Sequence, residues 1–275
     1  MEKRILKYAC LSAGVLLGSI LAYQGMNKQI ENRVDHILEE RIYQYENEIR
    51  NAHREHAHGI IDNIVPLRSF IKYSTPLKQG LQTTRIDSDG LIVNYEENDY
   101  IITVAHNVSR DRIISNTGVY PGTTLYSETS WNGIDLEHIY RNPEKDVAIF
   151  RFPDEVPRNF EMPEYDISLG DSDSLQKFDD LYLIGNPALS GTHIREGIVA
   201  NSEEDRSFRV LGNFSSKGVG LSMPARPGDS GRPVVRPYYD PIDGHGLELI
   251  GLLKESHHSG MSGYMAPINW FKDNM

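Results

Sequence analysis

The chain has 275 residues, a length that suits one domain of about 200 residues with an appendage, or two small domains. Its content of 39% hydrophobic and 24% charged residues is ordinary for a globular protein. Its formal net charge of -11 at pH 7 argues against a nucleic-acid-binding protein, which needs a basic surface to neutralise phosphates. Cys10 is the only cysteine, which excludes an intrachain disulfide, so a domain outside the cytosol must be held together by its core alone.

The first 25 residues predict a membrane anchor. Basic residues at positions 3, 4 and 7 precede an uncharged run from Tyr8 to Tyr23, at the short end of what spans a bilayer. A cleavable signal peptide would show a small-x-small site just after this run, and Ala22–Gly25 is a poor match. We therefore expect residues 1–25 to be a signal anchor, a single-pass transmembrane segment of the cell membrane. The basic cluster places all that follows outside the cytoplasm, secreted if the anchor is cleaved.

Residues 26–65 predict a helical stalk. Apolar side chains recur there at steps of three and four on an otherwise charged helix, without glycine or proline between Met26 and Gly59. The stripe consists of Val34, Leu38, Ile42, Tyr45, Ile49, Ala52, His56 and Ile60. The thirty-odd residues between Met26 and Gly59 would form a rod roughly 45–50 Å long, which would lift a domain off the membrane or pair with a second copy. A homo-oligomer through residues 30–60 is one hypothesis, although the stripe keeps no strict heptad.

Three histidines at the end of this helix, His53, His56 and His58, invite a metal-site interpretation. Their spacing lacks the carboxylate of a His-Glu-x-x-His helix, and no other motif ligand lies nearby. We therefore expect solvated helix residues and no metal.

Beyond Pro66 the pattern changes to short apolar runs separated by turn residues. Ten such runs predict an all-β domain, either a sandwich or a barrel, over residues 66–275. The predicted strands are Leu91–Tyr95, Tyr100–Val104, Val147–Phe152, Leu181–Ile184, Gly197–Ala200, Phe208–Leu211, Val219–Met223, Pro233–Val235, Leu247–Leu253 and Tyr264–Ile268. The last residues, from Asn269, suit a closing helical turn or two.

Three segments carry chemistry. His106 stands at the end of the apolar strand that begins at Ile101, and Asp146 stands where another apolar strand begins. Ser230 lies between Gly228-Asp229 and Gly231, and glycines let backbone N–H groups converge beside a serine oxygen. A serine nucleophile needs a base, and the base needs an acid that fixes its tautomer. Each segment alone is also compatible with an ordinary turn or strand end.

These segments resemble the motifs of trypsin-like (chymotrypsin-fold) serine proteases, in that family's order. Thr103–His106 reads Thr-Val-Ala-His, Asp146–Ile149 reads Asp-Val-Ala-Ile, and Gly228–Gly231 reads Gly-Asp-Ser-Gly. Leu183–Pro187 and Leu249–Gly251 are similar to the Deg/HtrA-like prokaryotic branch. The resemblance runs from about residue 82 to residue 270 and implies a double antiparallel β-barrel with the catalytic residues between the barrels. No PDZ module is expected after it.

The resemblance implies a serine endopeptidase that cleaves extended polypeptide without a cofactor. Ser230 would be the nucleophile, His106 the general base and Asp146 its orienting carboxylate, and the N–H groups of Gly228 and Ser230 would form the oxyanion hole. The further residues expected to bind substrate are Lys254, Glu255 and Ser256, as a pairing strand, with Pro224 and Ala225 near the base of the primary specificity pocket. A pocket so lined would not select a basic side chain through a buried acid.

Two departures from the family pattern concern the segment around the nucleophile. Arg232 stands where the family usually has glycine. Asp229 has no matching Ile-Val-Gly-Gly terminus to pair with, so we expect activity without zymogen cleavage and a cation such as Arg226 or Arg232 beside Asp229.

Two other functions compete with this one. An α/β-hydrolase needs glycine two residues after its serine, where Arg232 stands, and helices alternating with strands. A membrane-anchored binding or scaffold protein with an inactive protease-like domain remains the alternative, since a fold alone does not guarantee chemistry.

Overall fold

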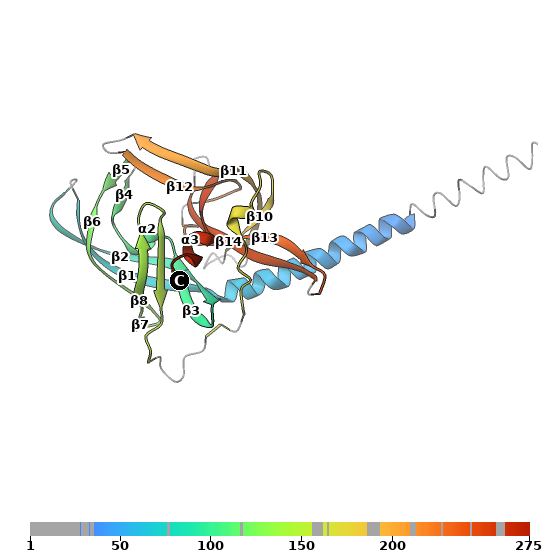
Figure 1. Ribbon diagram of the computed structural model, residues 1–275, viewed down its shortest axis with the longest axis horizontal. Coiled ribbons are helices and arrows are strands. Elements are labelled where there is room, and N and C mark those ends of the chain that lie inside the picture. The colour runs from blue at the N-terminus through green and yellow to red at the C-terminus, as the bar shows by residue number, and fades with distance from the viewer. Residues whose placement is uncertain are drawn as a thin grey trace, which may run out of the picture. The chain divides into compact units, whose positions relative to one another are not determined.

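The computed structural model describes residues 28, 33, 36–75, 78–115, 118–155, 162–163, 165–185, 193–209, 213–226, 228–242, 244–256 and 262–275. The chain divides into two compact units, Met1–Ala52 and His53–Met275. A helix covers residues 36–62 and is drawn in blue in Figure 1. The expected anchor, residues 1–25, lies outside the described residues. Among the residues that are described, no helix combines the length and the apolar character needed to cross a membrane.

In the first unit, several apolar side chains of the helix are exposed to solvent. Leu38, Ile42 and Tyr45 are 53%, 57% and 53% exposed. These residues belong to the predicted stripe, and its pairing with a second copy stays a prediction.

The β structure of the second unit begins with an open antiparallel sheet of seven strands, in the order β7-β6-β1-β2-β3-β9-β8. Its end strands, β7 and β8, do not pair with each other within the described residues. A short hairpin, β4 with β5, pairs with no other described strand. The bounds are β1 Ile64–Thr75, β2 Lys78–Tyr95, β3 Asn98–Thr103, β4 Arg112–Ser115, β5 Gly118–Pro121, β6 Thr123–Trp131, β7 Ile134–Asp135, β8 Glu137–Asn142 and β9 Val147–Arg151.

The remaining strands form a closed antiparallel barrel in the order β10-β11-β12-β15-β14-β13. It closes where β10 pairs with β13, with Leu183 opposite Val234. The bounds are β10 Asp180–Gly185, β11 His193–Arg209, β12 Asn213–Ser222, β13 Pro233–Asp240, β14 Gly244–Ser256 and β15 Gly263–Pro267. Three short helical segments complete the unit: α2 Ala105–Val108, the 3-10 turn η1 Ser172–Ser174, and α3 Ile268–Lys272 near the C-terminus marked in Figure 1.

Side-chain alternation explains why β1 forms. Val65, Leu67 and Ile71 are buried and alternate with exposed residues, which is the pattern of a strand with one face on the core. Ser69 interrupts the apolar series, and its hydroxyl shares a 2.9 Å hydrogen bond with the Thr129 hydroxyl of β6. This buried polar pair satisfies its own hydrogen-bonding needs, so the alternation continues without an unpaired group.

One apolar cluster joins the sheet to the barrel. It includes Val104 and Val147 from the sheet and Leu249 and Phe271 from the barrel side, all wholly buried. The last helical turns of residues 53–62 contribute Ala57, Ile60 and Ile61 to the same cluster. The compact unit therefore starts at His53, upstream of the expected domain start at residue 66. Two members of this cluster hold the site residues in place, because Val104 lies two residues before His106 and Val147 directly follows Asp146.

The all-β expectation is confirmed, and so is a closed six-stranded second barrel. The first half differs from the expected barrel, because it is an open sheet of seven strands. The physical reason is visible at its edge: β7 has only two residues and pairs with β6 alone. A strand this short offers too few backbone groups to close the sheet onto β8.

Candidate active site

His106 is placed by the end of strand β3. The strand runs to Thr103, and α2 begins at Ala105, so the chain turns sharply just where the imidazole is presented. The Ala105 N–H donates to the backbone oxygen of Asp146 at 3.1 Å and ties this turn to the start of β9. The His106 side chain is 20% exposed, which leaves one edge of the ring accessible.

Asp146 holds His106 with both of its carboxylate oxygens. The His106 backbone N–H donates to Oδ1 at 2.9 Å, and the His106 Nδ1 lies 2.8 Å from Oδ2. An ionised carboxylate can only accept hydrogen bonds, so Nδ1 carries the proton and Nε2 is left as the basic nitrogen. The Asp146 side chain is only 3% exposed, and low solvent access strengthens this interaction.

The backbone of Asp146 is unusual. Its φ is 62°, in the left-handed region that residues with a side chain rarely adopt. The turn before it is fastened by the Asn142 side chain, which accepts hydrogen bonds from the N–H groups of Glu144 and Lys145 at 3.0 and 2.9 Å. Strained backbone of this kind persists where neighbouring contacts fix it, and it gathers at functional sites.

Ser230 lies in the loop between β12 and β13 of the barrel, at a point where the loop contacts the sheet half. Both flanking glycines have positive φ, 94° at Gly228 and 91° at Gly231. A Cβ at Gly231 would stand 2.9 Å from the Asn107 amide nitrogen and 2.9 Å from the Asp89 carbonyl oxygen. Gly231 is therefore required by its conformation and by close packing. Its N–H donates to the Leu253 carbonyl at 2.7 Å, which fixes the loop against β14.

A chain of polar groups links the Ser230 loop to the sheet. The Asn107 amide donates to the Ser230 carbonyl oxygen at 3.2 Å and to the Thr103 hydroxyl at 3.2 Å. The Thr103 hydroxyl donates in turn to the Asp89 carbonyl at 2.8 Å. Asn107 and Thr103 are buried, so these hydrogen bonds fix the position of the Ser230 backbone relative to the segment that contains His106.

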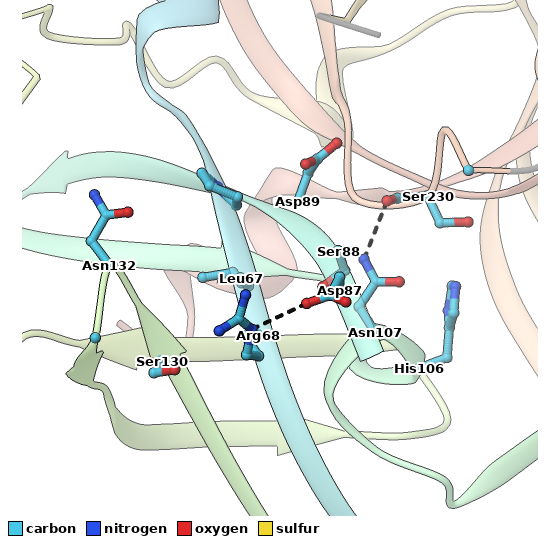
Figure 2. A pocket seen from close by; sticks show the side chains of 13 residues that line it. Leu67, Arg68, Asp87, Ser88, Asp89, His106, Asn107, Ser130, Asn132 and Ser230 are labelled. Atoms are coloured by element: carbon cyan, nitrogen blue, oxygen red, sulfur yellow. Dashed lines mark hydrogen bonds and ion pairs between the residues drawn. The ribbon is translucent and has the colours of Figure 1, made fainter. Parts of the chain in front are cut away.

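His106 and Ser230 line one cavity of about 690 Å³ (Figure 2). Within the described residues no hydrogen bond joins the His106 ring to the Ser230 hydroxyl, and such contacts often tighten only when substrate binds. Gly228 lines the same cavity. No described residue accepts a hydrogen bond from the N–H of Gly228 or Ser230, so these donors face no competing acceptor there.

Asp229 is the centre of a charged cluster under the loop. Arg195 Nη1 lies 2.6 Å from its Oδ2, and Arg232 Nη1 lies 2.7 Å from its Oδ1. The Arg226 backbone N–H, not its guanidinium, donates to Oδ2 at 2.6 Å. Burial acts to raise the pKa of Asp229, but these hydrogen bonds and cations outweigh it and hold the pKa below its ordinary value. The expected cation beside Asp229 is thus Arg232, joined by Arg195.

The residues expected to bind substrate have different positions. Ala225 is wholly buried in the core of the barrel, while Pro224 is exposed and its carbonyl accepts a hydrogen bond from Arg195 at 3.0 Å. Lys254 is also wholly buried, and its Nζ donates to the Lys145 carbonyl at 3.3 Å. Its side chain therefore points into the protein. Glu255 and Ser256 end strand β14, and their side chains lie outside the described ones.

Two of the three helix histidines, His53 and His56, differ from the solvated residues expected. His53 packs its ring 5.8 Å from Tyr182 and 6.3 Å from His245, and His56 Nδ1 lies 2.5 Å from the Tyr165 hydroxyl. Both are partly buried, because the last turns of the helix belong to the compact unit, and only His58 is exposed. In the described parts of the chain, no three histidine, cysteine or acidic side chains are grouped as metal ligands.

Arg195, Asn107 and Asp89 were missed by sequence reasoning. Asn107 follows the histidine directly, and this adjacency was the one available signal. Arg195 lies in β11, and Asp89 lies in β2, outside every predicted motif. Their roles depend on contacts between distant segments.

A family model of the trypsin-like peptidase domain matches residues 87–239, a range that includes His106, Asp146 and Ser230. Among solved structures, the chain is similar to Rv3671c from M. tuberculosis H37Rv, crystallised as a serine-to-alanine mutant in an inactive form. The two are 11% identical, the alignment covers 79% of this chain and 87% of that chain, and the TM-score is 0.46. No curated protein sequence matches this chain.

Proposed function

The chain belongs to the trypsin-like peptidase domain family, and on this premise we propose that it is a serine endopeptidase that cleaves extended polypeptides through an acyl-enzyme. The observation that carries the proposal is that His106 pairs with a buried Asp146 and lines one cavity together with Ser230. These are the base, the orienting acid and the nucleophile of a serine hydrolase. The open sheet and closed barrel support a chymotrypsin-like arrangement of the two halves.

In the proposed reaction, the Ser230 Oγ attacks the scissile carbonyl carbon while His106 Nε2 takes its proton. Asp146 stabilises the imidazolium that forms and keeps Nδ1 protonated. The tetrahedral intermediate breaks its C–N bond as the imidazolium gives the proton to the leaving amine. Water then attacks the acyl ester with the same base, which releases the acid and restores Ser230.

The proposed oxyanion hole consists of the N–H groups of Gly228 and Ser230. Support comes from the positive φ of Gly228 and from the absence of a competing acceptor among the described residues. Donors fixed before the reaction cost no reorganisation when the negative charge develops.

We also propose that the enzyme is active without proteolytic processing. In this proposal the double contact of Asp229 with Arg195 and Arg232 replaces the new amino terminus that activated trypsin-like enzymes require. Both guanidinium groups are internal to the chain, at 19% and 10% exposure, so the loop is held before any cleavage.

Substrate would pair its backbone with the end of β14. β13 pairs with β14 only as far as Leu252, and the Ser230 loop contacts Leu253, so Glu255 and Ser256 extend past the nucleophile. A strand in this position reads extended peptide by main-chain hydrogen bonds. Pro224 stays the proposed base of the primary pocket, whereas the side chains of Ala225 and Lys254 are enclosed by the protein.

Anchoring by residues 1–25, with the protease domain outside the cytoplasm, is part of the same proposal. Pairing of two chains through residues 30–60 is a further part, supported by the exposure of Leu38, Ile42 and Tyr45. Analytical ultracentrifugation of the purified chain tests the pairing, which a monomer would contradict.

Cleavage of a peptide library by the purified full chain tests the activity, with Ser230→Ala as the blank. We expect the wild type to cut peptides that the variant leaves intact. The inactive scaffold is the alternative, and it predicts binding of peptides by both proteins and cleavage by neither.

A further inference from the structure

The cavity beside Ser230 lies on one particular side of the scissile bond of a bound peptide, and the proposed reaction indicates which side. His106 gives its proton to the leaving amine, so the peptide segment after the scissile bond must lie on the imidazole side of Ser230. The acyl segment would lie on the other side, along β14. The described lining of the cavity comes from His106, the Ser230 loop and the strands of the open sheet, and it contains no residue of β14. The cavity is therefore on the leaving side.

Apart from His106, the cavity is lined by three charged side chains, Arg68 of β1 and Asp87 and Asp89 of β2. Two of them neutralise each other: Arg68 Nε donates to Asp87 Oδ1 at 3.3 Å, the ion pair drawn in Figure 2. Asp87 also accepts a hydrogen bond from Arg85 at 2.8 Å. Asp87 therefore carries little uncompensated charge.

Asp89 is different, because no cation of the described residues lies within hydrogen-bond distance of its carboxylate. Its one ion pair there is with Arg232 Nε, at 3.9 Å, which is beyond hydrogen-bond distance. The guanidinium of Arg232 is already bound to Asp229 through Nη1, and its buried Nε has no hydrogen-bond partner. Asp89 thus brings a weakly compensated carboxylate into a cavity that also contains His106 and Ser230.

Burial raises the pKa of Asp89, and the charge of Arg232 only partly opposes this. A cation brought close to Asp89 would relieve that cost, because it favours the ionised carboxylate. The side chains that carry such a charge in a peptide are lysine and arginine.

We propose that Asp89 makes the leaving side of the active site selective for peptides with a lysine or arginine shortly after the scissile bond. The inference rests on the proposed peptidase function and names a feature of its substrates. It concerns the leaving side alone and leaves the primary pocket at Pro224 unchanged.

The test uses the full chain and peptides that are identical except at the first three positions after the scissile bond. Each position carries lysine, its uncharged analogue norleucine, or glutamate. We expect kcat/KM for at least one lysine peptide to exceed that for its norleucine match by roughly two- to fivefold, as for a partly exposed ion pair. The glutamate peptide should be cleaved more slowly than both. The lysine preference should fade as the pH is lowered, because the raised pKa of Asp89 lets it take up a proton at a higher pH than an ordinary carboxyl group does.

Asp89→Asn removes the charge and keeps the shape, and it should bring the lysine to norleucine ratio close to one. Asp99→Asn is the matched control, since Asp99 is an exposed acid of β3 that lies outside the cavity, and it should keep the wild-type ratio. Thermal unfolding verifies that both variants fold.

Equal cleavage of all three peptides by the wild type, or an unchanged ratio in Asp89→Asn, would overturn the selectivity while the peptidase function stands. If the wild type cuts no peptide, or Ser230→Ala cuts as well as the wild type, both proposals fail. Fluorescence anisotropy of the labelled lysine and norleucine peptides with Ser230→Ala gives a reading independent of turnover. Tighter binding of the lysine peptide, lost on adding Asp89→Asn, is expected, and equal binding would contradict the proposal.

Discussion

Asp146 accepts two hydrogen bonds from His106, one from the backbone N–H at 2.9 Å and one from the imidazole Nδ1 at 2.8 Å. The first fixes where the histidine stands, and the second fixes its tautomer and the plane of its ring. A single buried side chain thus determines both the position and the protonation of the proposed base.

The first prediction follows from this double contact. Asp146→Asn leaves one oxygen to accept from the backbone N–H, but its amide turns a donor toward Nδ1 and so favours the tautomer with a protonated Nε2. We expect kcat to fall roughly 10³- to 10⁴-fold with little change in KM. Steady-state kinetics on a cleaved peptide measures this, with circular dichroism as the check on folding. A fall of less than about tenfold would show that Asp146 is not the orienting acid.

The second prediction concerns the cluster around Asp229. Arg195→Met removes one of two guanidinium partners of a buried carboxylate, at 2.6 Å, and we expect a loss of about 2–3 kcal/mol in the free energy of unfolding together with reduced kcat. Arg226→Met is the matched control, because Arg226 contacts Asp229 through its backbone N–H, which the substitution keeps. Urea unfolding distinguishes the two variants. Equal stability of Arg195→Met and the wild type would mean that Arg195 does not hold the loop.

The third prediction concerns Gly231. An alanine there must adopt a φ of 91° and place its Cβ 2.9 Å from Asn107 and Asp89, so the Ser230 loop must shift. We expect Gly231→Ala to lose most activity and about 2–4 kcal/mol of stability. Gly80→Ala is the control, since Gly80 has a φ of 80° but no atom within 4 Å of an added Cβ. If both variants lost the same stability and kept activity, the close packing at Gly231 would have no role.

The fourth prediction is a pH dependence of stability. Burial, followed by the charges of His245 and His56, lowers the pKa of His53 below its ordinary 6.5. As the pH falls below about 6.5, the unfolded chain takes up the proton before the folded chain does. The stability contributed by neutral His53 is therefore present above the ordinary pKa, and it is lost as the pH falls through the lowered pKa of the folded chain. The melting temperature should therefore fall between about pH 7.5 and about pH 5.5.

The matched variants for this prediction are on the same helix. His53→Phe keeps a ring beside Tyr182 and His245, and it should reduce the fall in melting temperature. His58→Gln changes an exposed histidine and should leave the fall unchanged. Identical pH profiles for His53→Phe and the wild type would exclude His53 as a contributor.

Much of the fold was predictable wherever apolar runs were continuous. The predicted strands at Leu91–Tyr95, Val147–Phe152 and Leu247–Leu253 coincide closely with parts of β2, β9 and β14, which are buried on both faces or nearly so. Strands β1 and β6 were not predicted, because their buried faces include Ser69 and Thr129. A polar pair that satisfies itself inside the core removes the apolar alternation on which prediction depends.

In the candidate site, residues that belong to short local motifs were predictable, and residues held by contacts between distant segments were not. Short motifs indicated His106, Asp146 and Ser230 as site residues; in the structure His106 contacts Asp146, and His106 and Ser230 line one cavity. The role of Arg195 was not predictable, because its contact with Asp229 joins β11 to a loop 34 residues further along the chain. Local patterns contain no signal for such an ion pair. No local pattern predicts that the Lys254 side chain is buried, and the backbone pairing of Lys254 with substrate that the resemblance implies stays a prediction.

The most direct test of the account is labelling of the intact full chain with a fluorophosphonate, which reacts only with an activated serine. Mass spectrometry should find one adduct, mapped to Ser230, on a chain whose N-terminus is uncleaved, and none on His106→Ala. No adduct on the intact chain, or an adduct that forms only after proteolysis, would contradict an enzyme that the Asp229 cluster keeps ready for catalysis.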